Sequence, residues 1–107
     1  MLICIVYMEN NDPIKLPEKL TRQQLGMSNN AVAKLVKRNG DVCWYQRSDG
    51  VHEVVIIQVR HDENGQLREY YPNMKDFGVS AWNFLKPERA MRKFKELCNA
   101  SNDGYYR

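Results

Sequence analysis

Apolar residues in the C-terminal part of the chain follow a helical period. Pro87 favours a helix start, because proline is tolerated in a first turn, and Glu88 suits the positive end of a helix. Five apolar residues then recur at helical spacing: Ala90, Met91, Phe94, Leu97 and Cys98. This pattern predicts a final helix that lies with one apolar face on the rest of the protein.

Shorter apolar runs separated by turn residues predict strands elsewhere. The predicted strands are Leu2–Met8, Val42–Ser48, Val51–His61, Gln66–Tyr71 and Val79–Phe84. Asp49-Gly50 and Asn64-Gly65 are strong signals for two-residue hairpin turns. Counting outward from two-residue turns places Trp44 opposite Val55 and Arg60 opposite Glu69.

The segment between the first two predicted strands has a different pattern, which predicts two helices joined by a tight turn. The first helix is predicted over residues 16–25 and the second over residues 29–38. Gly26 suits the turn, Ser28 suits an N-cap, and Asn39-Gly40 provides a C-terminal stop. One stripe of the second helix is apolar and consists of Ala31, Val32, Leu35 and Val36.

Together these elements predict a single α+β domain. The expected order is β-α-α-β-β-β-β-α, with a mainly antiparallel sheet and the helices on one face. The domain is predicted to span residues 1–100, and residues 101–107 to form a flexible tail. A chain of 107 residues can bury a modest core without disulfides or metal.

Composition and charge narrow the function classes. The chain is 43% hydrophobic and 27% charged, and no apolar run is long enough to span a membrane, so we expect no membrane partner. Three widely separated cysteines favour reduced thiols in a cytoplasmic protein. The net charge is +3, but residues 15–47 contain seven basic and only two acidic residues. Such a basic segment either binds phosphate or forms well-solvated helix surfaces.

The sequence offers little support for catalysis. His52 and His61 are the only histidines, and neither has a metal-ligand spacing with a cysteine. No phosphate-binding glycine loop, nucleophile elbow or paired-carboxylate motif is visible. We therefore predict a protein that is not an enzyme, with no catalytic residues, no metal and no cofactor.

The segment over residues 20–40 resembles the helix-turn-helix of DNA-binding regulators. The helix-turn-helix-like part of the domain is predicted over residues 17–39. Gly26 lies at the turn between Leu25 and Met27, and Val32 and Leu35 occupy core positions of the second helix. The resemblance implies a small regulator that binds duplex DNA with its second helix in the major groove. The resemblance is compatible with a homodimer as well as with a monomer.

The resemblance also implies separate roles for individual side chains. Asn29, Asn30 and Lys34 would reach base edges, and Lys34, Lys37 and Arg38 would contact phosphate. The remaining expected nucleic-acid contacts are Arg22, Gln23, Ser28 and, at the tip of a hairpin wing, Arg47. The structural alternatives are that the asparagines and Ser28 only cap a helix start and that the hairpin only begins the central sheet.

Two other functions fit the same sequence. The first is a protein-binding module or inhibitor, such as a phage or mobile-element accessory protein, that acts through an aromatic sheet face or an edge strand. Its expected partner-binding residues are Tyr45, Arg60 and Tyr71. The second is a module for single-stranded nucleic acid or RNA, in which the aromatic residues stack on bases.

Overall fold

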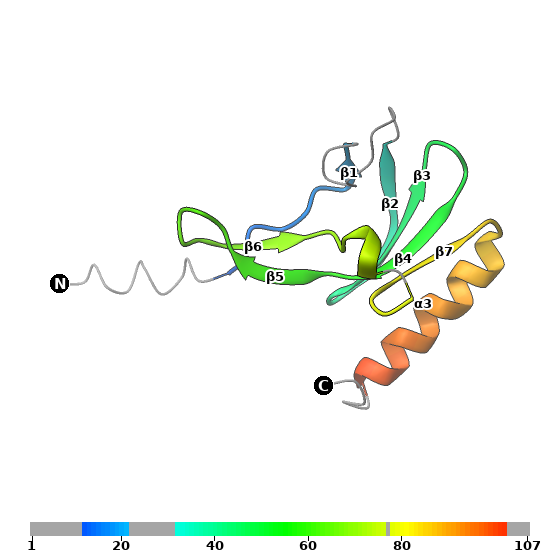
Figure 1. The fold of residues 1–107 in the computed structure, drawn as a ribbon. Helices are drawn as coiled ribbons and strands as arrows, with labels where there is room; N and C mark the ends of the chain where they lie inside the picture. Colours follow the sequence, from blue (N-terminus) through cyan, green and yellow to red (C-terminus); the bar gives the residue numbers. More distant parts are fainter. Residues whose placement is uncertain (1–11, 22–31, 77, 103–107) are drawn as a thin grey trace.

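The computed structural model describes residues 12–21, 32–76 and 78–102 and shows an α+β fold, as predicted (Figure 1). Five strands form an antiparallel sheet in the order β1-β2-β3-β4-β7, and β5 and β6 form a separate two-stranded ribbon. The strands are β1 Lys19–Leu20, β2 Ala33–Asn39, β3 Val42–Arg47, β4 His52–Ile56, β5 Gln58–His61, β6 Leu67–Tyr70 and β7 Ala81–Phe84. A 3₁₀ turn, η2, spans Met74–Asp76, and one helix, α3, spans Pro87–Asn102.

The final helix is confirmed, and it packs on one face of the sheet, which we call the helix face. There Phe94 and Leu97 lie against Val42, Trp44 and Val54, all of which are buried. The rings of Trp44 and Phe94 have their centroids 6.4 Å apart in a tilted arrangement. Aromatic and aliphatic packing of this kind is the main source of stability for a helix on a sheet.

The opposite face of the sheet carries a second apolar cluster. Cys43, Tyr45 and Val55 point to this side, and Leu20 and Tyr71 pack against them. Both faces of the central strands are therefore buried, whereas the sequence predicted a sheet with helices covering one face. This is why β3 and β4 read as nearly continuous apolar runs.

Both predicted hairpins exist, but the predicted register is wrong by one residue. Trp44 pairs with Val54 rather than Val55, and Arg60 pairs with Arg68 rather than Glu69. In each loop a glycine at positive φ donates its N–H to the carbonyl three residues earlier, from Gly50 to Arg47 and from Gly65 to Asp62. The loops therefore have three residues instead of two, which is the second common hairpin geometry.

The long strand predicted over residues 51–61 divides at Ile57. The first half, β4, belongs to the main sheet, and the second half, β5, pairs with β6 in the ribbon that extends away from it (Figure 1). Ile14 bridges to Arg68 in parallel, with Ile14 N–H 3.0 Å from the carbonyl of Leu67. Residues 14–16 thus run along the outer side of β6.

The two predicted N-terminal helices are not observed over residues 16–21 and 32–38, the parts of them that the structure describes. In the described part of the predicted first helix, Lys19–Leu20 form strand β1. The predicted second helix is wrong from Ala33 onward, because Ala33–Asn39 form strand β2. Gly40 has a positive φ of 62° and belongs to the turn between β2 and β3, so Asn39-Gly40 starts a hairpin instead of ending a helix. The predicted strand over residues 2–8 and the end of the predicted tail, 103–107, lie outside the described residues.

Candidate nucleic-acid interface

The predicted DNA-contacting residues fall into three groups. Arg22, Gln23, Ser28, Asn29 and Asn30 lie outside the described residues. Two more, Lys34 and Lys37, are exposed on β2. The last two, Arg38 and Arg47, are held by carboxylates of the protein itself. The structure therefore leaves Lys34 and Lys37 as the described residues that are free to meet a phosphate.

A β-bulge sets the direction of Lys37. Leu35 pairs with Tyr45 and Lys37 pairs with Trp44, so Val36 is an extra residue on β2. Directly paired residues of antiparallel strands share a face. Because Trp44 packs against α3, Lys37 points to the helix face, and so does Lys34, which pairs with Gln46 two residues further along β3.

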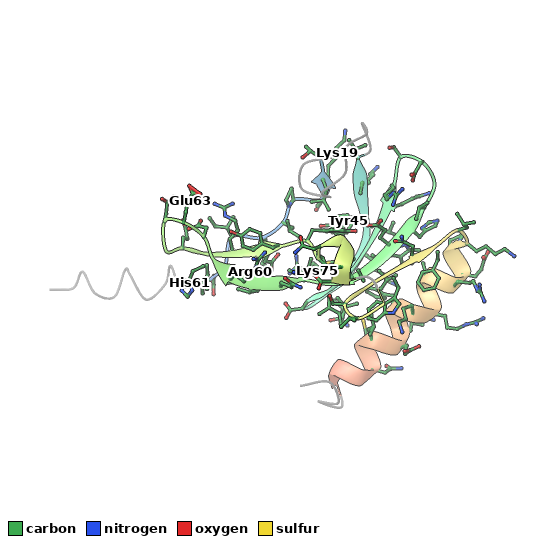
Figure 2. The ribbon with its side chains drawn as sticks, in the orientation of Figure 1. Lys19, Tyr45, Arg60, His61, Glu63 and Lys75 are labelled. Atoms are coloured by element: carbon green, nitrogen blue, oxygen red, sulfur yellow. The ribbon has the colours of Figure 1, made fainter. Side chains whose placement is uncertain are left out.

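Lys19 was not predicted to be a functional residue, yet it lies directly opposite Lys34 on β1 (Figure 2 labels Lys19 at this outer strand). Like charges in a directly opposed pair destabilise a sheet. The pairing of Lys19 with Lys34 follows from the strand register, and it could not be predicted because both residues were assigned to helices. Such an unfavourable arrangement needs a compensating anion or solvent to screen it.

The helix face is only partly covered by α3. Among the described elements the helix packs mainly on β3, β4 and β7, and Lys19, Lys34 and Lys37 of β1 and β2 are exposed. Lys37 shares a shallow hollow with Lys95 and Asn99 of α3, over Phe94. We use the name lysine strip for Lys19, Lys34, Lys37 and Lys95. None of the ion pairs between described side chains includes a member of the strip.

Arg38 points away from the lysine strip, because it pairs with Cys43 on the opposite face of the sheet. Its guanidinium forms a two-pronged ion pair with Glu69, with distances of 2.9 Å from Nη1 to Oε1 and 2.6 Å from Nη2 to Oε2. Glu69 Oε1 also accepts the N–H of Leu16 at 3.0 Å. Burial would raise the pKa of Glu69, but these hydrogen bonds lower it below its ordinary value. Arg38 therefore joins the ribbon to the main sheet, and the prediction that it contacts phosphate is not supported.

Arg47 is part of a second network. It binds Asp49 and, through Nη1 at 2.8 Å, the Oε2 atom of Glu53, whose side chain is buried. The hydroxyl of Tyr71 donates to the other oxygen of Glu53. Burial and the nearby Glu53 carboxylate raise the pKa of Tyr71, so its hydroxyl stays a donor. With Arg47 so engaged, its predicted role as a phosphate contact at a wing tip is not supported.

The aromatic surface expected for a protein partner is absent at the predicted residues. Tyr45 is 0% exposed and Tyr71 is 7% exposed, and their rings pack edge to face with centroids 5.6 Å apart. Tyr45 also donates its hydroxyl to the carbonyl of Pro17 at 3.0 Å. Arg60 is exposed on the ribbon, where its guanidinium carbon lies 4.2 Å from the ring centroid of Tyr70 (Figure 2). Only Arg60 of the three predicted partner-binding residues is therefore accessible.

The buried polar groups near α3 are also engaged. Trp44 Nε1 donates to His52 Nδ1 at 3.0 Å, and both side chains are buried. Within residues 12–21, 32–76 and 78–102 no cluster of three or more His, Cys, Asp or Glu side chains is arranged to hold a metal ion. In the same residues no helix has the length and apolar character of a membrane span.

Comparisons with known proteins add no family to this description. No protein-family model, no curated protein and no solved structure matches the chain. The functional argument therefore depends on the geometry of the lysine strip alone.

Proposed function

We propose that this protein binds duplex DNA through the lysine strip, without enzymatic activity. The observation that carries the proposal is the direct opposition of Lys19 and Lys34, which are both exposed and have no acidic partner among the described side chains. A row of phosphates would turn this repulsive arrangement into an attractive one. Lysines on one surface neutralise phosphates and release counterions, which is the main source of sequence-independent affinity for DNA.

Duplex DNA fits the strip better than single-stranded nucleic acid does. Proteins that bind single strands combine cations with exposed aromatic rings on which bases stack. The strip consists of lysines, and the aromatic side chains of Tyr45 and Tyr71 are buried. Phosphate contacts position a protein on DNA without reading its sequence. The proposed function is therefore DNA binding dominated by contacts with the phosphate backbone of the duplex.

The test is the salt dependence of binding to a short DNA duplex, with binding measured by fluorescence anisotropy. If all four lysines of the strip contact phosphate, log K should fall with log salt with a slope of about −3.6, since each neutralised phosphate contributes about 0.9. Lys34→Gln with Lys37→Gln should reduce the slope to about −1.8. Lys34→Glu with Lys37→Glu should abolish binding while the circular-dichroism spectrum stays that of the wild type.

Lys15→Glu with Lys75→Glu is the matched control. Both residues are exposed, and the double substitution changes the net charge by the same amount as the strip variant. Figure 2 labels Lys75 at η2, away from α3. Binding that persists in Lys34→Glu/Lys37→Glu, or that is lost equally in the control, would refute the strip as the contact surface.

A further inference from the structure

The outer edge of β7 presents backbone groups that none of the described strands covers. β7 is the last strand of the five-stranded sheet and pairs only with β4. Ile56 N–H bonds to the carbonyl of Ser80 at 2.8 Å, so the bonded pairs along β7 are those of Trp82 and Phe84. The backbone N–H and C=O of Asn83, which lies between them, therefore point away from the sheet.

Asn83 keeps these groups free. No hydrogen bond to its backbone N–H or C=O exists outward among the described residues, whereas the carbonyl of Ala81 accepts the N–H of Gly78 at 2.6 Å. Val79 and Leu85, on either side of the strand, are 76% and 80% exposed and are the most exposed large apolar residues described. Proteins usually block an open edge that is flanked by apolar side chains, because the edge pairs readily with another strand.

Cationic side chains lie beside this edge. Asn83, Phe84 and Leu85 line a shallow hollow together with Lys86 and Arg89 at the start of α3. A second hollow continues past Phe84 and Arg89 to Arg92. Lys86, Arg89 and Arg92 are exposed, and none of the ion pairs between described side chains includes them. By contrast, the neighbouring Lys93 is engaged with Glu96 and lies over the ring of Trp82.

We propose that the edge of β7 is a docking site for an extended acidic segment of a partner protein, which adds to the sheet as a further strand. Main-chain bonds to Asn83 would fix the segment, and alternate side chains would point to opposite sides of the sheet. Carboxylates on the α3 side then meet Arg89 and Arg92, and apolar residues on the other side meet Leu85. A second copy of this chain is disfavoured, because its own Lys86, Arg89 and Arg92 would bring like charge to the same seam.

The edge and the charge can be tested separately with an acetylated peptide of alternating Val and Glu. Asn83→Pro removes the outward N–H, which the fold does not use, and proline is tolerated on an edge strand. This variant should bind the peptide about tenfold more weakly, whereas Asn83→Ala, which keeps the N–H, should bind it as the wild type does. Arg89→Glu with Arg92→Glu should weaken peptide binding by at least a similar factor without touching the edge. A peptide of alternating Val and Lys should not bind.

The outcomes also separate this site from the lysine strip. Lys34→Glu with Lys37→Glu should leave peptide binding unchanged, and Asn83→Pro should leave DNA binding unchanged. Equal peptide binding by Asn83→Pro and Asn83→Ala would refute strand addition. Loss of duplex binding in Arg89→Glu/Arg92→Glu would assign these cations to DNA instead, and a dimer in sedimentation that disappears in Asn83→Pro would assign the edge to a second copy. Either result overturns the proposal of an acidic partner.

Discussion

Arg38→Met is expected to destabilise the protein by about 3 kcal/mol at neutral pH. The substitution keeps most of the aliphatic stem and removes the guanidinium. Glu69, which is only 5% exposed, would then retain the N–H of Leu16 as its one described donor. Breaking a buried ion pair by removing one partner costs about 3–5 kcal/mol, because a buried charge is left uncompensated. The Arg38 side chain is 20% exposed, so the lower end of this range applies.

This loss should shrink as the pH falls. In the wild type the pKa of Glu69 is below its ordinary value of 4.5, so its stabilising contribution is complete above pH 4.5 and is lost as the pH drops through the folded-state pKa. Without Arg38, burial dominates and should raise the pKa of Glu69 above 4.5. Protonation then stabilises the variant relative to its unfolded state. The difference in unfolding free energy between the two proteins should therefore decrease from neutral pH toward pH 4.5 and below.

The assay is urea unfolding followed by tryptophan fluorescence at several pH values. Asp49 and Asp62 also have lowered pKa values, but they are present in both proteins and cancel in the difference. Glu69→Gln is the matched control, because it removes the charge while an amide oxygen can still accept from Leu16. The double variant Arg38→Met/Glu69→Gln should lose less than the sum of the single losses. A difference that is independent of pH, or single losses that add fully, would show that the ion pair does not join the ribbon to the sheet.

Two further predictions concern buried groups near the centre of the sheet. His52→Leu should lower the free energy of unfolding in urea by about 2 kcal/mol, because the N–H of Trp44 is left buried without an acceptor. His52→Asn supplies a carbonyl oxygen and should recover part of this loss. Equal losses in the two variants would contradict the role of the hydrogen bond. Burial raises the pKa of Cys43 to about 12, so a thiol reagent at neutral pH should label Cys43 only at the rate of global unfolding. The labelling is measured by mass spectrometry. Rapid labelling of Cys43 in the folded protein would refute this prediction.

The parts of the fold that were predictable are those with one strong local signal. The final helix was readable from Pro87 and from the helical spacing of residues such as Phe94 and Leu97, and all described parts of that pattern are borne out. The hairpins at Gly50 and Gly65 were also readable. Their register was not, because both two-residue and three-residue loops place a glycine at positive φ. A difference of one residue in the loop exchanges the two faces of a strand.

The prediction of a second helix was wrong from Ala33 onward because the sequence signals of this segment fit both a helix and a hairpin. Asn-Gly ends helices, but it is also among the strongest hairpin signals, and here Gly40 opens the turn to Val42. Ala33 and Leu35 alternate with Lys34 as they would in a half-buried strand, and they pack with the cluster around Tyr45. A run this short fits both periods, so the tertiary pairing with β3 decides.

The exposed lysines were identified even though their element was wrong, and the bulge at Val36 explains why. In a regular strand Lys37 would share a face with Ala33 and Leu35, and its charge would point into the apolar cluster. The extra residue moves Lys37 to the helix face beside Lys34 and sends Arg38 to Glu69 on the other side. It also leaves Val36 itself 45% exposed. The one inserted residue therefore places Lys37 in the lysine strip and also turns Arg38 toward Glu69 of the ribbon. The proposed DNA-binding face and the stability of the ribbon thus depend on the same bulge in β2.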